Sequence, residues 1–287
     1  MNRGVRLAIL AFAIAFAGGV TAHAGPHARR AGPSCGGNAA LRAAASANAA
    51  SLDSLAVDLF GRPETGWAIY APAVAQEIRT RCAPDRAGFA RALERWQARR
   101  ALPATAVMDA DTLTAMKSDW QDRRPFFRLR DQGTCPPPPA DRRLAQAKPS
   151  EVLEGGKPVR LRRPALRAWR RMAAAARHRD PAIAADPDAL KLFSGFRDPE
   201  DDAARCASEN NCQGLVRAAC SAHRTGLALD LMVGAAPGFT ADSSADANRL
   251  YQTRTPAYRW LVRNARRFGF VNYVFEPWHW EWTGERP

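Results

Sequence analysis

The stretch SAHRTGLALDL, residues 221–231, predicts a turn followed by a buried strand. After Gly226 the residues alternate, so the three leucines share one face of the strand while Asp230 lies on the other. A carboxylate on an otherwise apolar strand is costly to bury unless it binds something. His223 precedes the glycine turn, and a chain reversal there places it beside Asp230. The pattern therefore indicates a candidate site.

A second segment, EPWHWEW at residues 276–282, has the same character. Its tryptophans alternate with His279 and Glu281, which predicts a strand with one aromatic face and one polar face. Glu276 stands just before Pro277, whose fixed backbone angle holds the carboxylate apart from the strand. The two segments together offer two imidazoles and several carboxylates.

Such a set suits a metal. With His223, Asp230 and His279 as ligands, zinc keeps an open fourth position for water, as in catalytic rather than structural sites. Bound Zn²⁺ lowers the pKa of that water to ~7, and a carboxylate that does not bind the metal must then accept and return a proton. Glu276 is the candidate, and Glu281 competes because it shares a strand face with His279. Taken singly, His279 also fits a packed residue and Asp230 a capping residue.

Four sequence motifs, taken in order, resemble a known family. SGFR (194–197), the stretch at 221–231, WLVRNARRFGF (260–270) and EPWHWEW (276–282) follow the pattern S-x-H-x-x-G-x-A-x-D and then E-x-W-H. In order and spacing they resemble the VanY-type zinc D-alanyl-D-alanine carboxypeptidases, a family that cleaves peptidoglycan stem peptides. The resemblance implies a zinc metallopeptidase, a hydrolase that removes the terminal D-alanine.

The resemblance also implies roles for particular residues. They are the Zn²⁺ ligands His223, Asp230 and His279, the general base and acid Glu276, Arg197 as oxyanion stabiliser, and Ser221 lining the substrate pocket. Without the resemblance, a surface ion pair is the favoured interpretation of Arg197. These residues do not fix which bond is cut, so an endopeptidase, an L,D-carboxypeptidase and a non-catalytic wall-binding module remain alternatives. No S-x-x-K motif is present, which argues against a serine-type DD-peptidase.

Residues 1–24 predict a secretory signal peptide. Arg3 and Arg6 precede an apolar run at 7–20, and Ala-His-Ala at 22–24 forms a small-x-small cleavage site. The run is shorter than the ~20 residues that cross a bilayer. We therefore expect an exported protein, periplasmic or associated with the cell wall, without a stable membrane span.

Six cysteines follow this signal. An even number in an oxidising compartment predicts disulfides, whose pairing the sequence leaves open. The cluster at 206, 212 and 220 has soft metal ligation as an alternative, but no C-x-x-C pair occurs.

The formal net charge of +14 favours polyanionic partners, either nucleic acid or an anionic envelope. The arginines are scattered and no nucleic-acid-binding motif is evident, so the expected partners are peptidoglycan stem peptides and not nucleic acid. Oligomeric state is left open.

Composition and periodicity predict an α+β protein. We expect a poorly ordered lead-in at 25–50, a small all-α domain at 51–125, a proline-rich linker at 126–155 that contains Cys135 and four prolines, and a zinc peptidase domain at 156–287. That last domain should hold a mainly antiparallel sheet with flanking helices, and residues 232–256 should form a loop over the cleft.

The helical part has a resemblance of its own. FARALERWQARRALPATAVMDADTLTAM, residues 89–116, resembles the peptidoglycan-binding repeat found beside many wall hydrolases. Ala101 and Ala106 stand where that repeat has glycines. The resemblance implies wall binding, while an amphipathic helical pair without that function remains the alternative.

Overall fold

The computed structural model describes residues 1, 34–131, 133, 135–208, 212 and 220–286. Apart from Met1, the signal peptide expected at 1–24 lies outside the described residues. Residues 34–287 form one compact unit. Within the described part of the chain, no helix has the length and apolar character needed to cross a bilayer.

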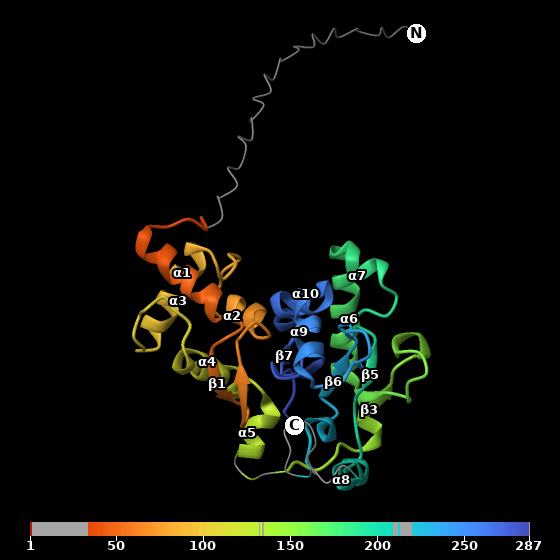
Figure 1. Ribbon diagram of the computed structural model, residues 1–287. Helices are drawn as coiled ribbons and strands as arrows, with labels where there is room; N and C mark the ends of the chain where they lie inside the picture. Colours follow the sequence, from red (N-terminus) through yellow and green to blue (C-terminus); the bar gives the residue numbers. More distant parts are fainter. Residues whose placement is uncertain (2–33, 132, 134, 209–211, 213–219, 287) are drawn as a thin grey trace. The chain divides into compact units, whose positions relative to one another are not determined.

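The fold is α+β, as predicted (Figure 1). All strand pairs of its main sheet are antiparallel. The sheet runs in the order β5 (Leu192–Ser194), β6 (Ala228–Leu231), β8 (His279–Trp282) and β7 (Phe270–Asn272). In its register Asp230 lies opposite both Ser194 of β5 and His279 of β8. The sheet therefore brings the two sequence segments of the candidate site into direct apposition.

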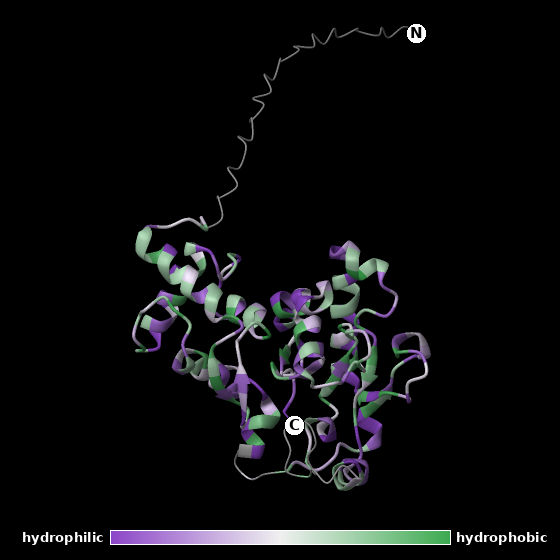
Figure 2. Cartoon of the chain, in the orientation of Figure 1, coloured by the Kyte–Doolittle hydropathy of each residue, from purple (hydrophilic) through white to green (hydrophobic). Residues whose placement is uncertain are grey.

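The alternation along β6 separates core from site. Leu229 and Leu231 are fully buried in a core formed with helices α6 (Arg163–Arg179) and α10 (Pro256–Asn264). Asp230 projects from the other face, as the alternation predicts. Figure 2 shows these helices with both hydrophobic and hydrophilic residues, as expected for elements with one buried face. One face of the sheet thus packs into the hydrophobic core, and the other carries the residues of the candidate site.

The first part of the unit is mostly helical. Its elements are α1 (Ala39–Ser51), β1 (Ala56–Leu59), β2 (Arg62–Thr65), α2 (Ala71–Glu77), α3 (Ala87–Arg99), α4 (Ala110–Asp122) and α5 (Pro125–Asp131). We refer to residues 39–124 as the helical segment.

Two expectations for this part were wrong. Helix α1 occupies much of the expected lead-in, because alanine has the highest helix propensity and the Asn38 side chain accepts a hydrogen bond from the Leu41 amide. The expected all-α domain also contains the β1–β2 hairpin. Its turn residues Phe60 and Gly61 have φ of 56° and 75°, the positive values that a tight hairpin requires.

The expected linker is also more ordered than predicted. It contains the short helices η1 (Asp141–Arg143) and η2 (Pro149–Glu151), and β3 (Leu144–Gln146) pairs with β4 (Arg160–Arg162). Further along the chain lie α7 (Pro181–Ala185), α8 (Pro199–Ser208), η3 (Ala222–Thr225), α9 (Asp246–Arg254) and η4 (Ala265–Phe268). Helix α9 corrects the prediction of a loop throughout 232–256. The domain boundaries proposed from the sequence stay a prediction.

The predicted disulfides are confirmed. The pairs are Cys35–Cys82, Cys135–Cys220 and Cys206–Cys212, and no cysteine is free. The second pair ties the proline-rich stretch to the residue that precedes Ser221. Metal ligation by the cysteine cluster is therefore wrong for this disulfide-bonded form.

Helix α3 ends in a Schellman motif with alanine in the glycine position. Ala101 has a φ of 55°, the Leu102 amide donates to Gln97 O at 3.1 Å, and the Ala101 amide donates to Ala98 O at 3.3 Å. The left-handed conformation costs a non-glycine residue about 1–2 kcal/mol. The sequence departs from the repeat here, but the backbone keeps the conformation that glycine favours.

We therefore expect Ala101→Gly to raise the free energy of unfolding by about 0.5–1 kcal/mol, because relief of the left-handed strain exceeds the added entropy of the unfolded chain. Ala98→Gly, inside the same helix, is the control and should lower that free energy by a similar amount. Urea denaturation of both variants measures whether each one raises or lowers the free energy of unfolding. Destabilisation by Ala101→Gly would contradict the argument.

Candidate metal centre

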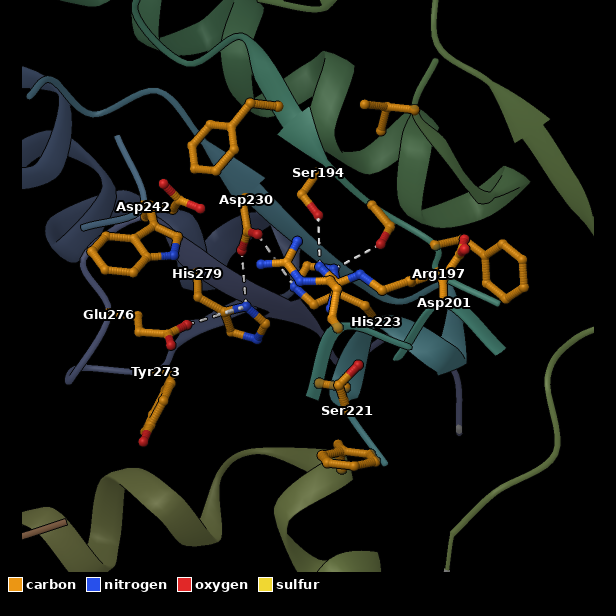
Figure 3. Close-up of a pocket in the computed structure, with 18 of the residues that line it drawn as sticks. Ser194, Arg197, Asp201, Ser221, His223, Asp230, Asp242, Tyr273, Glu276 and His279 are labelled. Carbon is orange, nitrogen blue, oxygen red and sulfur yellow. Dashed lines mark hydrogen bonds and ion pairs between the residues drawn. The ribbon is translucent and has the colours of Figure 1, made fainter. Parts of the chain in front are cut away.

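Three side chains converge in the cavity drawn in Figure 3. His279 Nδ1 lies 2.9 Å from Asp230 Oδ1, and His223 Nε2 lies 3.3 Å from Asp230 Oδ2. All three residues are buried, and one potential ligand atom from each lies within 4.8 Å of the others. Zn²⁺ with bonds of ~2.0–2.1 Å at tetrahedral angles separates its ligand atoms by about 3.3 Å. The arrangement is thus compact enough for one cation.

Local structure explains the convergence. Asp230 and His279 face each other because they are register partners on β6 and β8. His223 lies on η3, and Gly226 ends that turn with a φ of 68°. This positive φ favours glycine, and the space is also tight, because a Cβ on Gly226 would lie 3.1 Å from Leu144 Cδ2. The chain reversal returns His223 to the side of Asp230.

The hydrogen bond of His223 fixes which ring nitrogen faces inward. Its Nδ1 lies 2.7 Å from the carbonyl oxygen of Gly195, and a carbonyl can only accept. The proton therefore belongs on Nδ1, and Nε2 directs a lone pair at the carboxylate of Asp230. Two acceptors at this distance repel each other unless a cation or a proton lies between them. The chemistry of the set therefore fits a metal ion.

Titration behaviour follows from burial and these contacts. Burial raises the pKa of Asp230, but the two histidines outweigh it and hold that pKa well below the ordinary value. Burial lowers the pKa of His223. For His279 burial is outweighed by the hydrogen bond with Asp230 and by the nearby carboxylate of Glu281, which raise the pKa to about 9. A raised pKa favours the protonated form of His279, so metal binding would have to displace that proton.

Glu276 and Glu281 have different surroundings. Glu276 lies in the turn between β7 and β8, lines the cavity, and places Oε2 3.9 Å from His279 Nδ1. Glu281 Oε1 instead lies 2.6 Å from Arg124 Nη2. Burial raises the pKa of Glu281, but the charge of Arg124 and a hydrogen bond with His279 lower it to about 2. Of these two carboxylates, Glu276 is therefore the one that faces the cavity.

Arg197 and Ser221 meet on one buried carboxylate that the sequence did not reveal. Asp202, on α8, accepts from Arg197 Nη1 at 2.9 Å and from Ser221 Oγ at 2.6 Å, and it is 2% exposed. Arg197 Nη2 also donates to Ser194 Oγ at 3.3 Å. Asp202 belongs to an acidic first helical turn, where carboxylates are common, so only its burial distinguishes it.

A cavity of about 460 Å³ joins these groups, and all six residues singled out in the sequence line it. The helical segment also contributes to the wall, through Gln121 and Arg124. Sequence patterns gave no indication of that contribution, because the two parts are far apart along the chain.

His223, Asp230 and His279 thus form a candidate metal site on an antiparallel sheet. Residues 158–285 match the family model VanY, described as D-alanyl-D-alanine carboxypeptidase. The resemblance noted in the sequence is thereby confirmed.

One solved structure similar to the chain is a mutant of the vancomycin resistance D,D-pentapeptidase VanY, from a VanB-type resistance cassette, in complex with Zn(II). The sequence identity is 21% and the TM-score is 0.29, over 52% of this chain and 83% of that chain. No curated protein is similar enough to count as a match.

Proposed function

We propose that this chain is a zinc-dependent peptidoglycan peptidase that removes the terminal D-alanine of stem peptides. The observation that carries the proposal is the convergence of His223 Nε2, the Asp230 carboxylate and His279 Nδ1, with Glu276 beside them. The match of residues 158–285 to the VanY family model supports the choice of reaction.

His223, Asp230 and His279 would hold the metal. When bound there, zinc polarises a carbonyl and makes water more acidic. Glu276 then accepts a proton from the attacking water on its carboxylate and later donates it to the departing amine of D-alanine. Its position in a turn, before the fixed backbone angle of Pro277, keeps this carboxylate at the cavity.

Arg197 and Ser221 act on the substrate in this proposal. Asp202 orients the guanidinium of Arg197, whose remaining donors stabilise negative charge on the carbonyl oxygen. The Ser221 hydroxyl donates its proton to Asp202, so its oxygen keeps lone pairs that can accept a substrate N–H. Both residues thus rely on one buried carboxylate for their orientation.

The proposal places the enzyme outside the cytoplasm, in the periplasm or at the cell wall. Three disulfides fit an oxidising compartment. The net charge of +14 favours an anionic wall. Wall binding by the helical segment belongs to the same proposal.

Digestion of defined muropeptides tests the reaction. Purified protein should convert pentapeptides to tetrapeptides with loss of one D-alanine, a chelator should abolish the conversion, and added Zn²⁺ should restore it. Conversion of tetrapeptides to tripeptides would instead show an L,D-carboxypeptidase, and cleavage of cross-linked dimers an endopeptidase. Zinc-loaded protein without any product would favour a binding module. Mass spectrometry separates these products.

A further inference from the structure

The turn that carries Glu276 is embedded in the helical segment. Tyr273, Val274 and Phe275 belong to the hydrophobic core of that segment, and the ring of Phe60 lies 5.5 Å from Tyr273 and 5.4 Å from Phe275, measured between centroids. Aromatic pairs at this separation stabilise beyond their buried area. The segment before β8 is therefore packed by residues that precede the family-matched region.

A buried arginine reinforces this packing from the other side. Arg249, on α9, is fully buried, donates from Nε to Phe275 O at 2.9 Å, and donates from Nη2 to the Tyr70 hydroxyl at 2.6 Å. Tyr70 in turn donates to Glu64 at 2.5 Å. The residue adjacent to Glu276 is thus connected to the helical segment by charge-assisted hydrogen bonds.

A second connection joins the helical segment to the candidate metal centre. Arg124 follows the end of α4, and its Nε and Nη2 contact Glu281 Oε1 at 2.8 and 2.6 Å. Gln121 accepts from Arg124 Nη1 at 2.9 Å, and the Arg124 guanidinium lies 4.0 Å from the ring centroid of Tyr273. The Arg124 side chain is 8% exposed and that of Glu281 is 3% exposed. The contacts with Gln121 and Tyr273 therefore fix the position of the Arg124 guanidinium, and the guanidinium fixes the position of the Glu281 carboxylate.

Glu281 faces the outer nitrogen of His279. Its Oε1 lies 3.5 Å from His279 Nε2, within ion-pair distance, and Nε2 has no hydrogen-bond partner among the described residues. A carboxylate here favours the tautomer with the proton on Nε2, which leaves the Nδ1 lone pair for the side of Asp230. Outer partners of this kind orient metal-binding histidines and increase their basicity.

We propose that Arg124 of the helical segment is a positioning residue of the metal centre: it fixes Glu281, and Glu281 orients His279. The inference rests on the zinc role proposed for His279. It means that the site is not complete within residues 158–285, because one of its supporting residues comes from a part of the chain that the family model does not match.

The test is the zinc dissociation constant of the full mature chain, measured by competition with a chromophoric chelator. We expect Arg124→Gln to raise this constant, by no more than the roughly 10–100-fold that loss of the outer partner itself costs. Arg124→Lys keeps the charge but loses the fork geometry, so it should raise the constant less. Arg123→Gln is the matched control, because Arg123 pairs with Glu77 inside the helical segment at 2.6 Å. It should change thermal stability without changing zinc affinity.

The outcomes separate the two proposals. If the unaltered protein bound no zinc, the proposed function would fail before Arg124 was tested. If it bound zinc and Arg124→Gln bound zinc equally well, the positioning role would be wrong while the function stood. Equal losses of affinity in Arg124→Gln and Arg123→Gln would reduce the effect to general destabilisation and also overturn the inference. Should Arg124→Gln not fold, an unchanged constant in Arg124→Lys counts against it.

Discussion

Replacement of Glu276 by glutamine is expected to lower the rate of muropeptide hydrolysis by about 10²–10⁴-fold, the usual contribution of general acid–base catalysis. Glutamine keeps the shape of the side chain but cannot accept the proton of water. Zinc content should stay at the level of the unaltered protein, because His223, Asp230 and His279 are untouched. Rates from liquid chromatography of digested pentapeptides, together with metal analysis of the same samples, check both parts.

Glu154→Gln is the control for this substitution. Glu154 is exposed and lies away from the residues that line the cavity, so its variant should hydrolyse pentapeptides at the normal rate. A fully active Glu276→Gln enzyme with normal zinc content would remove Glu276 from the mechanism. The proton of the attacking water would then have to be accepted by other carboxylates of the cavity.

Short-range patterns predicted the sheet face well. The alternation after Gly226 placed Leu229 and Leu231 in the core and Asp230 on the opposite face, because side chains on a strand alternate regardless of what surrounds it. Periodicity could not reveal the β1–β2 hairpin, since its turn depends on Phe60 adopting a positive φ, which is unusual for a bulky residue. Helix α1 was missed because its alanine-rich sequence has little amphipathic contrast.

Long-range contacts explain what the sequence did not show of the site. Arg124 and Glu281 are ordinary charged residues in the sequence, and their contact joins positions 157 residues apart. Asp202 meets Ser221, which lies 19 residues further along the chain. Glu281 was a competitor for the role of base because it shares a strand face with His279. Glu281 instead pairs with Arg124 and is not among the residues that line the cavity, and this contact depends on how the helical segment packs. No local pattern encodes that packing.

Asp230→Asn should remove the metal itself. The amide replaces one acceptor oxygen with an N–H donor and removes the negative charge that faces both imidazoles at 2.9 and 3.3 Å. Loss of an outer partner costs about 10–100-fold in metal affinity, so loss of a ligand should cost more than about 100-fold. Dialysed Asp230→Asn protein should retain almost no zinc, and hydrolysis should fall to background.

Asp242→Asn provides the comparison for metal content, because Asp242 lines the same cavity and its carboxylate accepts from Thr240 Oγ1 at 2.8 Å, apart from the converging set. It should keep its zinc. Together with Glu276→Gln, these variants distinguish metal binding from catalysis, which a loss of activity alone does not do. Asp230→Asn should lose both zinc and turnover, whereas Glu276→Gln should lose turnover alone. If Asp230→Asn kept stoichiometric zinc after dialysis, the aspartate would not be a ligand. The convergence of these three side chains would then be a buried ion-pair cluster, and a metal-dependent hydrolase could not be based on it.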